Sequence, residues 1–305
     1  MGVRGVDLGA CRLADRTEHI QLNQFLLTLA NLVPKRVKRL ILGKQEAPSW
    51  VANRIHGVLN RAPVERYPCL ECSGPLKGYR MRIDWQRYRG FLYGTWEPDV
   101  VQSIQNTVRE GWVAVDAGAH IGYYTLLLAR LVGSAGRVFA FEPMTANFDV
   151  LRENISLNGL TQAEAINKAV VNQTGPLQLS LPEQGDLPEG TSVHEFRGVR
   201  PVTVDAVALD DFFADRRRRV DFLKMDVEGA EADVLRGARA LIETDHPTME
   251  IEIHHFDGHR DRNPVPAMLE EWGYRVDWID FSEAWTSHVL ATWPQSNTQP
   301  PKGTC

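Results

Sequence analysis

Acidic and histidine residues stand at the ends of several apolar segments that have the pattern of buried strands. Carboxylates and imidazoles can move protons, hold ribose hydroxyls or bind cations, so this shared position is a chemical signal. If the strands are parallel, their carboxyl ends meet at one edge of a sheet, where such folds bind ligands. The candidates at this edge are Asp116, Glu142, Asp226, Glu228, Glu252, His254 and His255.

A glycine turn follows the first of these strands, in the sequence VDAGAHIGYYT over residues 115–125. A dinucleotide-binding turn has the sequence G-x-G-x-x-G, with an acidic residue about 20 positions later. Here three residues separate Gly118 from Gly122, and Asp116 stands at the mouth of the turn. A carboxylate there would repel a pyrophosphate in a partly desolvated pocket. The turn therefore favours a ligand with a positive centre, and the alternative is a simple tight turn before a helix.

S-adenosylmethionine (SAM) has such a centre, because it carries an ammonium and a sulfonium group. Its carboxylate can still be held by backbone N–H groups or by the start of the following helix. Glu142 ends the next predicted strand, where a carboxylate can accept hydrogen bonds from ribose hydroxyls. Together these features favour SAM. An NAD-dependent oxidoreductase is the less favoured alternative, since the third glycine of its turn is missing.

The elements that would position these residues alternate between strand and helix patterns from residue 112 onward. Gly237 is expected to bend or interrupt one of the helices, and the glycines and prolines of 172–204 predict a small hairpin or a substrate-side insertion. The alternation predicts an α/β fold, with a mostly parallel sheet and helices on both faces. We expect strands at 113–116, 136–142, 163–167, 220–226, 247–253, 274–279 and 287–291, and helices at 121–131, 145–157, 230–241 and 266–272.

The residues before this core follow other patterns. Residues 21–60 show helical spacing of apolar side chains, with basic residues along the second part. We expect a solvated helix that packs on the main domain, and weak peripheral contact of residues 21–41 with a membrane is the alternative. Residues 79–85 alternate like a strand. The predicted division is an N-terminal helical extension (1–65), a strand and helix lead-in (66–110, with a helix at 99–109), the main domain (111–292) and a disordered tail (293–305).

The composition is that of a globular protein, with 43% hydrophobic and 24% charged residues among 305. A net charge of −5 offers no basic face, so we expect no nucleic-acid partner. The lone C-x-x-C of Cys69 and Cys72 lacks a second pair of zinc ligands, and reduced structural thiols are expected there. Neither a signal peptide nor an apolar run long enough for a transmembrane helix is found, and we expect a cytoplasmic protein.

The ordered motifs of the main domain resemble the FkbM-type SAM-dependent methyltransferases. They are VDAGAHIGYYT, FEPMTANFDVLRENISLNGL, LKMDVEGAEADVLRGA and MEIEIH, with GTWEP upstream. The resemblance covers about residues 94–290. It implies a class I methyltransferase (Rossmann-like) fold with a seven-stranded sheet, to which the N-terminal helical extension is added. It also implies transfer of a methyl group from SAM to an oxygen, often a hydroxyl of a sugar or natural product.

The resemblance assigns contacts with the cofactor residue by residue. Asp116, Gly118 and Gly122 would shape the methionine side of the pocket, and Glu142 would hold the ribose. Pro143 and Phe148 would flank the adenine, with the core as the alternative place for Phe148. The other expected contacts are Glu97, which would close over SAM, Ala119 and His120 in the turn, Asn167, Lys168 and Ala169 after the third strand, and Asp226 beside the reactive methyl.

Methyl transfer to a hydroxyl needs a group that removes a proton, because a neutral hydroxyl is a weak nucleophile. The candidates are Asp226, Glu228, His254 and His255. His254 is favoured as the base, because it shares a strand face with Glu250 and Glu252 and its ordinary pKa suits the task. Structural roles are the alternatives: a strand-end histidine for His254 and a turn cap for Asp226.

Two further charged residues near these motifs are expected to be structural. Lys224 alternates with Asp226 and would pair with a neighbouring carboxylate, while Glu231 would serve the first turn of a helix. Strand-end carboxylates could also hold a divalent cation. We expect no metal, because these acids already have roles toward SAM and the substrate.

The sequence thus predicts a SAM-dependent O-methyltransferase that acts on a small hydroxylated acceptor, such as a glycosyl group or a secondary metabolite. The alternative within the same family is a SAM-binding protein that acts on a macromolecule or without turnover.

Overall fold

A computed structural model describes residues 68–84, 87–182, 199–215, 218–255, 262–280 and 285–294. The helices predicted for residues 21–60, the rest of the N-terminal extension and most of the tail lie outside these ranges. The chain divides into two compact units, residues 1–98 with 153–159 and residues 99–152 with 160–305. The boundaries predicted at residues 65 and 110 stay predictions.

The first unit contains a short hairpin. Strand β1 (Cys69–Glu71) pairs antiparallel with β2 (Arg80–Arg82), so the predicted strand at 79–85 is confirmed only in its middle. The described part of the unit also contains the 3₁₀ turn η1 (Gly74–Leu76) and helix α4 (Arg89–Tyr93), which were not predicted. Asn154 holds β2 through two hydrogen bonds, with the N–H of Arg82 (2.6 Å) and with its carbonyl (3.1 Å).

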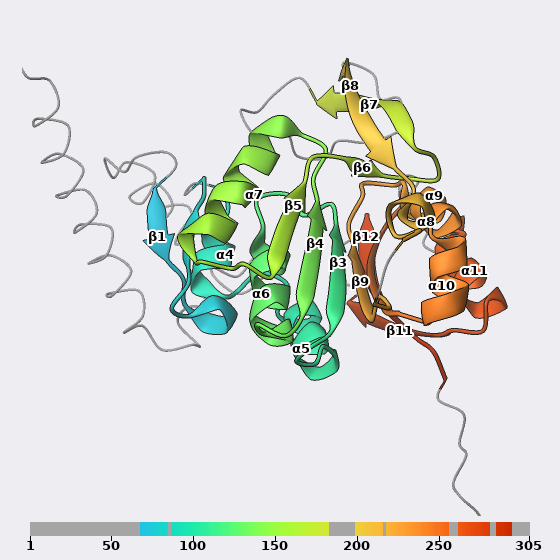
Figure 1. Ribbon diagram of the computed structural model, residues 1–305, viewed down its shortest axis with the longest axis horizontal. Helices are drawn as coiled ribbons and strands as arrows, with labels where there is room; N and C mark the ends of the chain where they lie inside the picture. The colour runs from blue at the N-terminus through green and yellow to red at the C-terminus, as the bar shows by residue number, and fades with distance from the viewer. Residues whose placement is uncertain are drawn as a thin grey trace, which may run out of the picture. The chain divides into compact units, whose positions relative to one another are not determined.

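The second unit is built on a seven-stranded sheet in the order β11-β12-β10-β9-β3-β4-β5. Strand β12 runs antiparallel to both of its neighbours, and the other neighbouring pairs are parallel. The predicted mostly parallel sheet is therefore confirmed (Figure 1). Its strands are β3 (Val113–Ala117), β4 (Arg137–Phe141), β5 (Ala163–Ile166), β9 (Phe222–Met225), β10 (Thr248–His254), β11 (Arg275–Asp280) and β12 (Thr286–Thr292).

The helices begin and end close to the predicted positions. Helix α6 starts only at Tyr123, because Gly122 before it has a left-handed backbone (φ 98°). The helix predicted for 230–241 is broken after Gly237, as expected, into α9 and α10. The helices are α5 (Pro98–Thr107), α6 (Tyr123–Val132), α7 (Thr145–Leu157), α8 (Leu209–Phe212), α9 (Glu231–Gly237), α10 (Arg239–Asp245) and α11 (Val265–Glu271).

The two faces of the sheet differ in chemistry. On one face, Val115 of β3, Leu223 of β9 and Ile251 of β10 join a buried apolar core with side chains of α8 to α11. On the other face, Asp116, Lys224 and Glu250 occupy successive places in the same cross-strand row, and all three are buried. Helix α6 covers this charged row, since its Thr125 hydroxyl bonds to Asp116 and its Tyr124 ring lies below Lys224.

A second, three-stranded sheet follows β5. Strand β6 (Ala169–Val170) pairs parallel with β8 (Val199–Val207), which pairs antiparallel with β7 (Gly175–Pro182). The hairpin predicted within 172–204 is confirmed in these strands, and residues 183–198 between them lie outside the described part.

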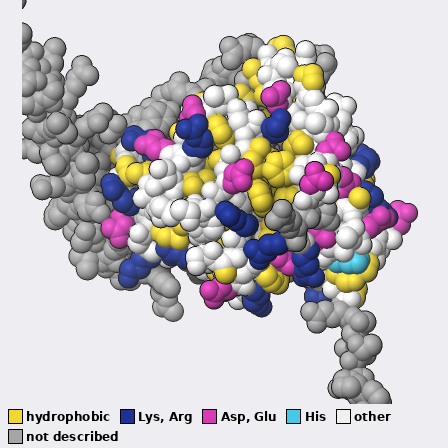
Figure 2. All heavy atoms as spheres, viewed as in Figure 1, with side chains coloured by type: hydrophobic (Ala, Val, Ile, Leu, Met, Phe, Trp, Pro, Cys, Tyr) yellow, Lys and Arg dark blue, Asp and Glu magenta, His cyan; other side chains and the backbone are white. Residues whose placement is uncertain are grey.

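Basic and acidic side chains are mixed on the surface shown in Figure 2. Lysine and arginine side chains are interspersed with aspartate and glutamate over the face drawn in Figure 2. In the described part of the chain, no helix combines the length and the apolar character that crossing a bilayer requires.

Gly237 ends α9 in tight contact with the bend that follows β6. A Cβ at this position would lie 2.3 Å from the carbonyl oxygen of Val171 and 2.7 Å from the Cα of Asn172. We expect Gly237→Ala to lower the free energy of unfolding by about 1–3 kcal/mol through overpacking against backbone. Helix propensity alone would change it by roughly 0.5–1 kcal/mol in the opposite direction. Urea denaturation measures the sign, and a more stable variant would contradict the close packing.

Candidate functional site

The turn between β3 and α6 is held against the ends of two other strands. The N–H groups of Gly118 and Ala119 both donate to the carbonyl of Phe141 at the end of β4 (3.0 and 2.8 Å). Gly118 has φ 82°, and a Cβ on it would lie 1.7 Å from the carbonyl oxygen of Asp226. Only glycine fits this backbone and this distance. The turn and the end of β9 therefore meet through their main chains.

Asp116 stands buried at the mouth of this turn. Its Oδ2 accepts a hydrogen bond from the Thr125 hydroxyl (2.6 Å), while Oδ1 is buried without a hydrogen-bond partner in the described part of the chain. Burial raises the pKa of Asp116 to about 6, although Lys224 and Thr125 act to lower it. The carboxylate is thus mostly ionised at neutral pH and retains an oxygen with capacity for a positive partner.

Glu142 follows β4 and is also buried. It accepts hydrogen bonds from the N–H of His120 (2.9 Å) on Oε2, and from the N–H of Met144 (2.9 Å) and the Asn147 amide (3.3 Å) on Oε1. Burial raises its pKa to about 7 against these hydrogen bonds. A carboxylate accepts about four hydrogen bonds, so Glu142 can take more than the three described. Its position beside the turn matches the place predicted for a ribose-binding acid.

The residues predicted around the adenine lie on three elements. Asn167 donates to the carbonyls of Glu142 (2.8 Å) and Pro143 (3.0 Å), so it ties the end of β5 to the end of β4. Phe148 is half-buried on α7, with the Arg152 guanidinium over its ring at 5.6 Å, and it is not part of the buried core. Lys168 and Ala169 form the junction from β5 to β6, with Lys168 half-buried and Ala169 buried.

The predicted catalytic residues meet at the ends of β9 and β10. The Nε2 atom of His254 lies 3.2 Å from Oε2 of Glu228 and 4.0 Å from Oδ1 of Asp226. Its Nδ1 atom lies 2.8 Å from Oε1 of Glu231. Burial alone would lower the pKa of His254, but hydrogen bonds to Glu228 and Glu231 and the charge of Asp226 raise it to about 11. His254 is therefore an imidazolium that joins three carboxylates.

Glu231 is a site residue that the sequence did not predict. It stands in the first turn of α9, as expected, but its side chain is buried and turned to His254. The same oxygen accepts the N–H of Gly229 (2.8 Å), which holds the turn after β9. The motif V-E-G-A-E contains the only available signal, a second acid three residues after Glu228. This signal was not decisive, because acidic residues are common in the first turn of a helix and need no further role there.

Left-handed backbones coincide with the predicted site. In the described part of the chain the non-glycine residues with positive φ are Glu97 (38°), His120 (50°), Glu228 (52°) and His246 (48°). The first three are predicted site residues. Such conformations are costly and persist mostly where surrounding structure requires them, often at functional sites. Glu97 belongs to the first unit and precedes α5.

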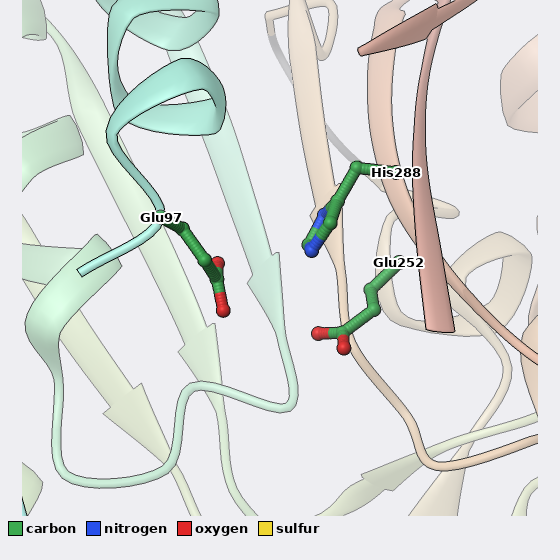
Figure 3. Close-up of side chains that lie close together, drawn as sticks. All are labelled: Glu97, Glu252 and His288. Carbon is green, nitrogen blue, oxygen red and sulfur yellow. The ribbon is translucent and has the colours of Figure 1, made fainter. Parts of the chain in front are cut away.

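A second histidine and acid pair continues the charged face toward β12. His288 lies opposite Glu252 in the register of β12 and β10, and Figure 3 shows their side chains next to each other. The Nδ1 atom of His288 is 2.8 Å from Oε1 of Glu250, which is fully buried. His255 is buried as well, and its backbone N–H donates to the carbonyl of Trp285 (2.7 Å). It fixes the end of β10.

Within the described part of the second unit, one group of side chains has the composition of a cation site. Ligand atoms of Asp226, Glu228 and His254 lie within 4.8 Å of one another. In this structure the protonated His254 supplies the positive charge between the two carboxylates. The absence of a functional metal, expected from the sequence, stays a prediction.

Comparisons with known proteins place the chain among methyltransferases. The family model described as "Methyltransferase FkbM domain" matches residues 116–276, just over half of the 305-residue chain. "Methyltransferase sdnD" of Sordaria araneosa is 28% identical over 218 residues, covering 61% of this chain and 82% of that protein. "Methyltransferase 1" of Beauveria bassiana is 28% identical over 183 residues, covering 53% and 72%.

Among solved structures, the chain is similar to methyltransferase FkbM from Methylobacillus flagellatus. It is 19% identical, with a TM-score of 0.41, and the match covers 69% of this chain and 56% of that one. The family match includes the turn at Asp116, the acid at Glu142 and the cluster at His254. The chain belongs to the FkbM methyltransferase family, whose fold is the class I methyltransferase fold and whose cofactor is SAM.

Proposed function

We propose that the protein transfers the methyl group of SAM to a hydroxyl of a small acceptor, such as a glycosyl group or a secondary metabolite. The observation that carries the proposal is the cluster of Asp226, Glu228 and His254 at the ends of β9 and β10, directly beside the glycine turn. Methylation of a hydroxyl needs a proton acceptor, and this cluster offers two partly exposed carboxylates, Asp226 and Glu228. The cytoplasmic location predicted from the sequence stays a prediction.

The residues around the turn fit SAM. Bound SAM supplies a methyl group on a positively charged sulfur. Asp116 keeps a buried carboxylate oxygen without a hydrogen-bond partner in the described part, which suits a cationic ligand and not a pyrophosphate. Gly118 and Gly122 bring the backbone close, and Glu142 has capacity for ribose hydroxyls. The roles of these residues, and those of Glu97, Pro143 and Phe148, belong to the proposal.

The proton of the acceptor hydroxyl goes to a carboxylate in this proposal. The sequence favoured His254 as the base, but a pKa of about 11 leaves its ring protonated at neutral pH. Asp226 is ionised, because the charges of Lys224 and His254 outweigh burial and hold its pKa below the usual value. His254 would then orient Asp226 and Glu228 toward the acceptor, and Glu231 would hold the imidazolium from behind.

The close approach of Gly118 to Asp226 gives a sharp test with a matched control. Gly118→Ala should abolish measurable SAM binding and reduce stability by about 1–3 kcal/mol more than Gly111→Ala. Gly111 has nearly the same φ (83° against 82°), but no atom lies within 4 Å of its Cβ position. Both variants share the left-handed strain, and only the first has the clash. Calorimetric titration with SAM and thermal unfolding measure the two effects, and equal losses in both variants would refute the argument.

The acceptor class is tested by formation of S-adenosylhomocysteine (SAH). The full chain is incubated with SAM and panels of hydroxylated small molecules, total RNA and protein extract. We expect SAH and a methyl ether only with small hydroxylated molecules. Methylation confined to RNA or protein would replace the small acceptor by a macromolecule. Tight SAM binding without turnover on any panel would count against an enzyme.

His254 is tested with an acceptor in hand. His254→Ala should reduce kcat by roughly 100-fold, because the two carboxylates lose their orientation and their compensating charge, while the Kd of SAM changes little. In the wild type, the plot of kcat at saturating SAM against pH should show no titration near pH 6.5, since the His254 ring has a pKa of about 11. A titration of kcat near pH 6.5 that disappears in His254→Ala would show that His254 is the base after all.

A further inference from the structure

Lys224 is a buried lysine in the middle of the sheet. Its side chain is 1% exposed, between Asp116 on β3 and Glu250 on β10 in the cross-strand row. Its Nζ atom lies 3.6 Å from Oδ2 of Asp226 and 4.8 Å above the centre of the Tyr124 ring. A lysine is rarely buried to this degree unless its charge is paired. Here Asp226 pairs with it, and Asp116 and Glu250 flank it in the cross-strand row.

The position of Lys224 links two parts of the pocket. Asp116 belongs to the turn that would face the methionine part of SAM, and Asp226 belongs to the cluster at the end of β9. Asp116 and Asp226 repel each other, and Glu250 adds to this repulsion from the far side of the row. Without a cation among them, buried carboxylates that repel one another take up protons. Lys224 is the cation that lies next to both.

We infer that Lys224 is a positioning residue, which keeps Asp116 and Asp226 ionised and thereby gives the pocket its preference for the sulfonium of SAM over the neutral thioether of SAH. The inference rests on the proposed roles of Asp116 and Asp226 toward the cofactor. It assigns Lys224 a part in selecting substrate over product, beyond the structural pairing expected from the sequence.

Other charged groups face these two carboxylates and enter the titration. Three charged groups act on Asp116: Lys224 of β9, Asp226 directly after β9, and Glu250 of β10. The groups that act on Asp226 are Lys224, His254, Glu252 and His288, and Asp226 in turn acts on Asp116, His120 and Glu142.

The ratio of two dissociation constants isolates the effect. SAM and SAH share the ribose, the adenine and the amino acid end, so titration of Glu142 near pH 7 affects both ligands alike. The Kd of SAH divided by the Kd of SAM therefore reports the charge beside the sulfur. In the wild type this ratio should exceed one at pH 8 and fall as the pH drops through about 6, where Asp116 takes up a proton.

The test is calorimetric titration of the full chain with SAM and with SAH between pH 5 and 8. In Lys224→Met the fall of the ratio should move to higher pH by at least about one unit, because an adjacent charge typically shifts a carboxylate pKa by that much or more. A purely structural lysine would weaken both ligands by the same factor and leave the pH of the fall unchanged. That result would overturn the inference.

Glu250→Gln is the matched control within the same buried row. It removes a charge of the opposite sign, and glutamine can still hydrogen-bond to His288. The fall of the ratio should move to lower pH, since Glu250 raises the pKa of Asp116. If Lys224→Met does not fold, this variant decides alone, and an unchanged or upward shift refutes the inference. A wild type that binds neither ligand would instead refute the cofactor roles on which the inference rests.

Discussion

The alignment of β3, β9 and β10 in the sheet decides which charged side chains are buried together and which reach the candidate site. Strands β3, β9 and β10 are parallel and buried on both faces, a setting that normally selects apolar residues throughout. Here one face is apolar and the other holds Asp116, Lys224 and Glu250 side by side. Each of these charges is tolerated only next to its neighbour in the row. A slip of one residue would place Lys224 in the apolar core under α8 to α11, so the charges themselves specify the pairing.

The same register also builds the edge of the sheet. Side chains on one face of a strand recur every two residues. The row that contains Lys224 and Glu250 is therefore followed, one step further along β9 and β10, by Asp226 and Glu252, and then by His254. The buried charges and the catalytic candidates are successive rows of one pattern. This continuity explains how a solvent-facing cluster can be affected by a lysine that water does not reach.

Much of this arrangement could be predicted from the sequence. The order of strands and helices followed from apolar periodicity, and the acids at the strand ends identified the edge where Asp116, Glu142 and Asp226 meet. The break at Gly237 and the hairpin after β6 were also predicted, because glycine and proline are local signals. The cofactor roles of individual residues were predicted as well, and they stay predictions.

Other features depend on contacts between distant segments. The role of Glu231 follows from its distance to His254, and no spacing rule links a first-turn acid to a histidine 23 positions later. The protonation of His254 depends on three carboxylates that only the folded chain brings together, so an ordinary histidine pKa gave the wrong starting point for its chemistry. The register that surrounds Lys224 is likewise a property of the sheet and not of any one strand.

The contact between Gly118 and the carbonyl of Asp226 has a consequence for anyone who would redesign the acceptor side. Because main chain meets main chain there, the turn at Gly118 cannot shift toward the turn that carries Glu228 without displacing it. Under the proposed function, insertions or backbone changes in residues 226–229 would therefore disturb SAM binding as well as the acceptor. Selection for new acceptors should therefore change side chains and leave the backbone of both turns intact.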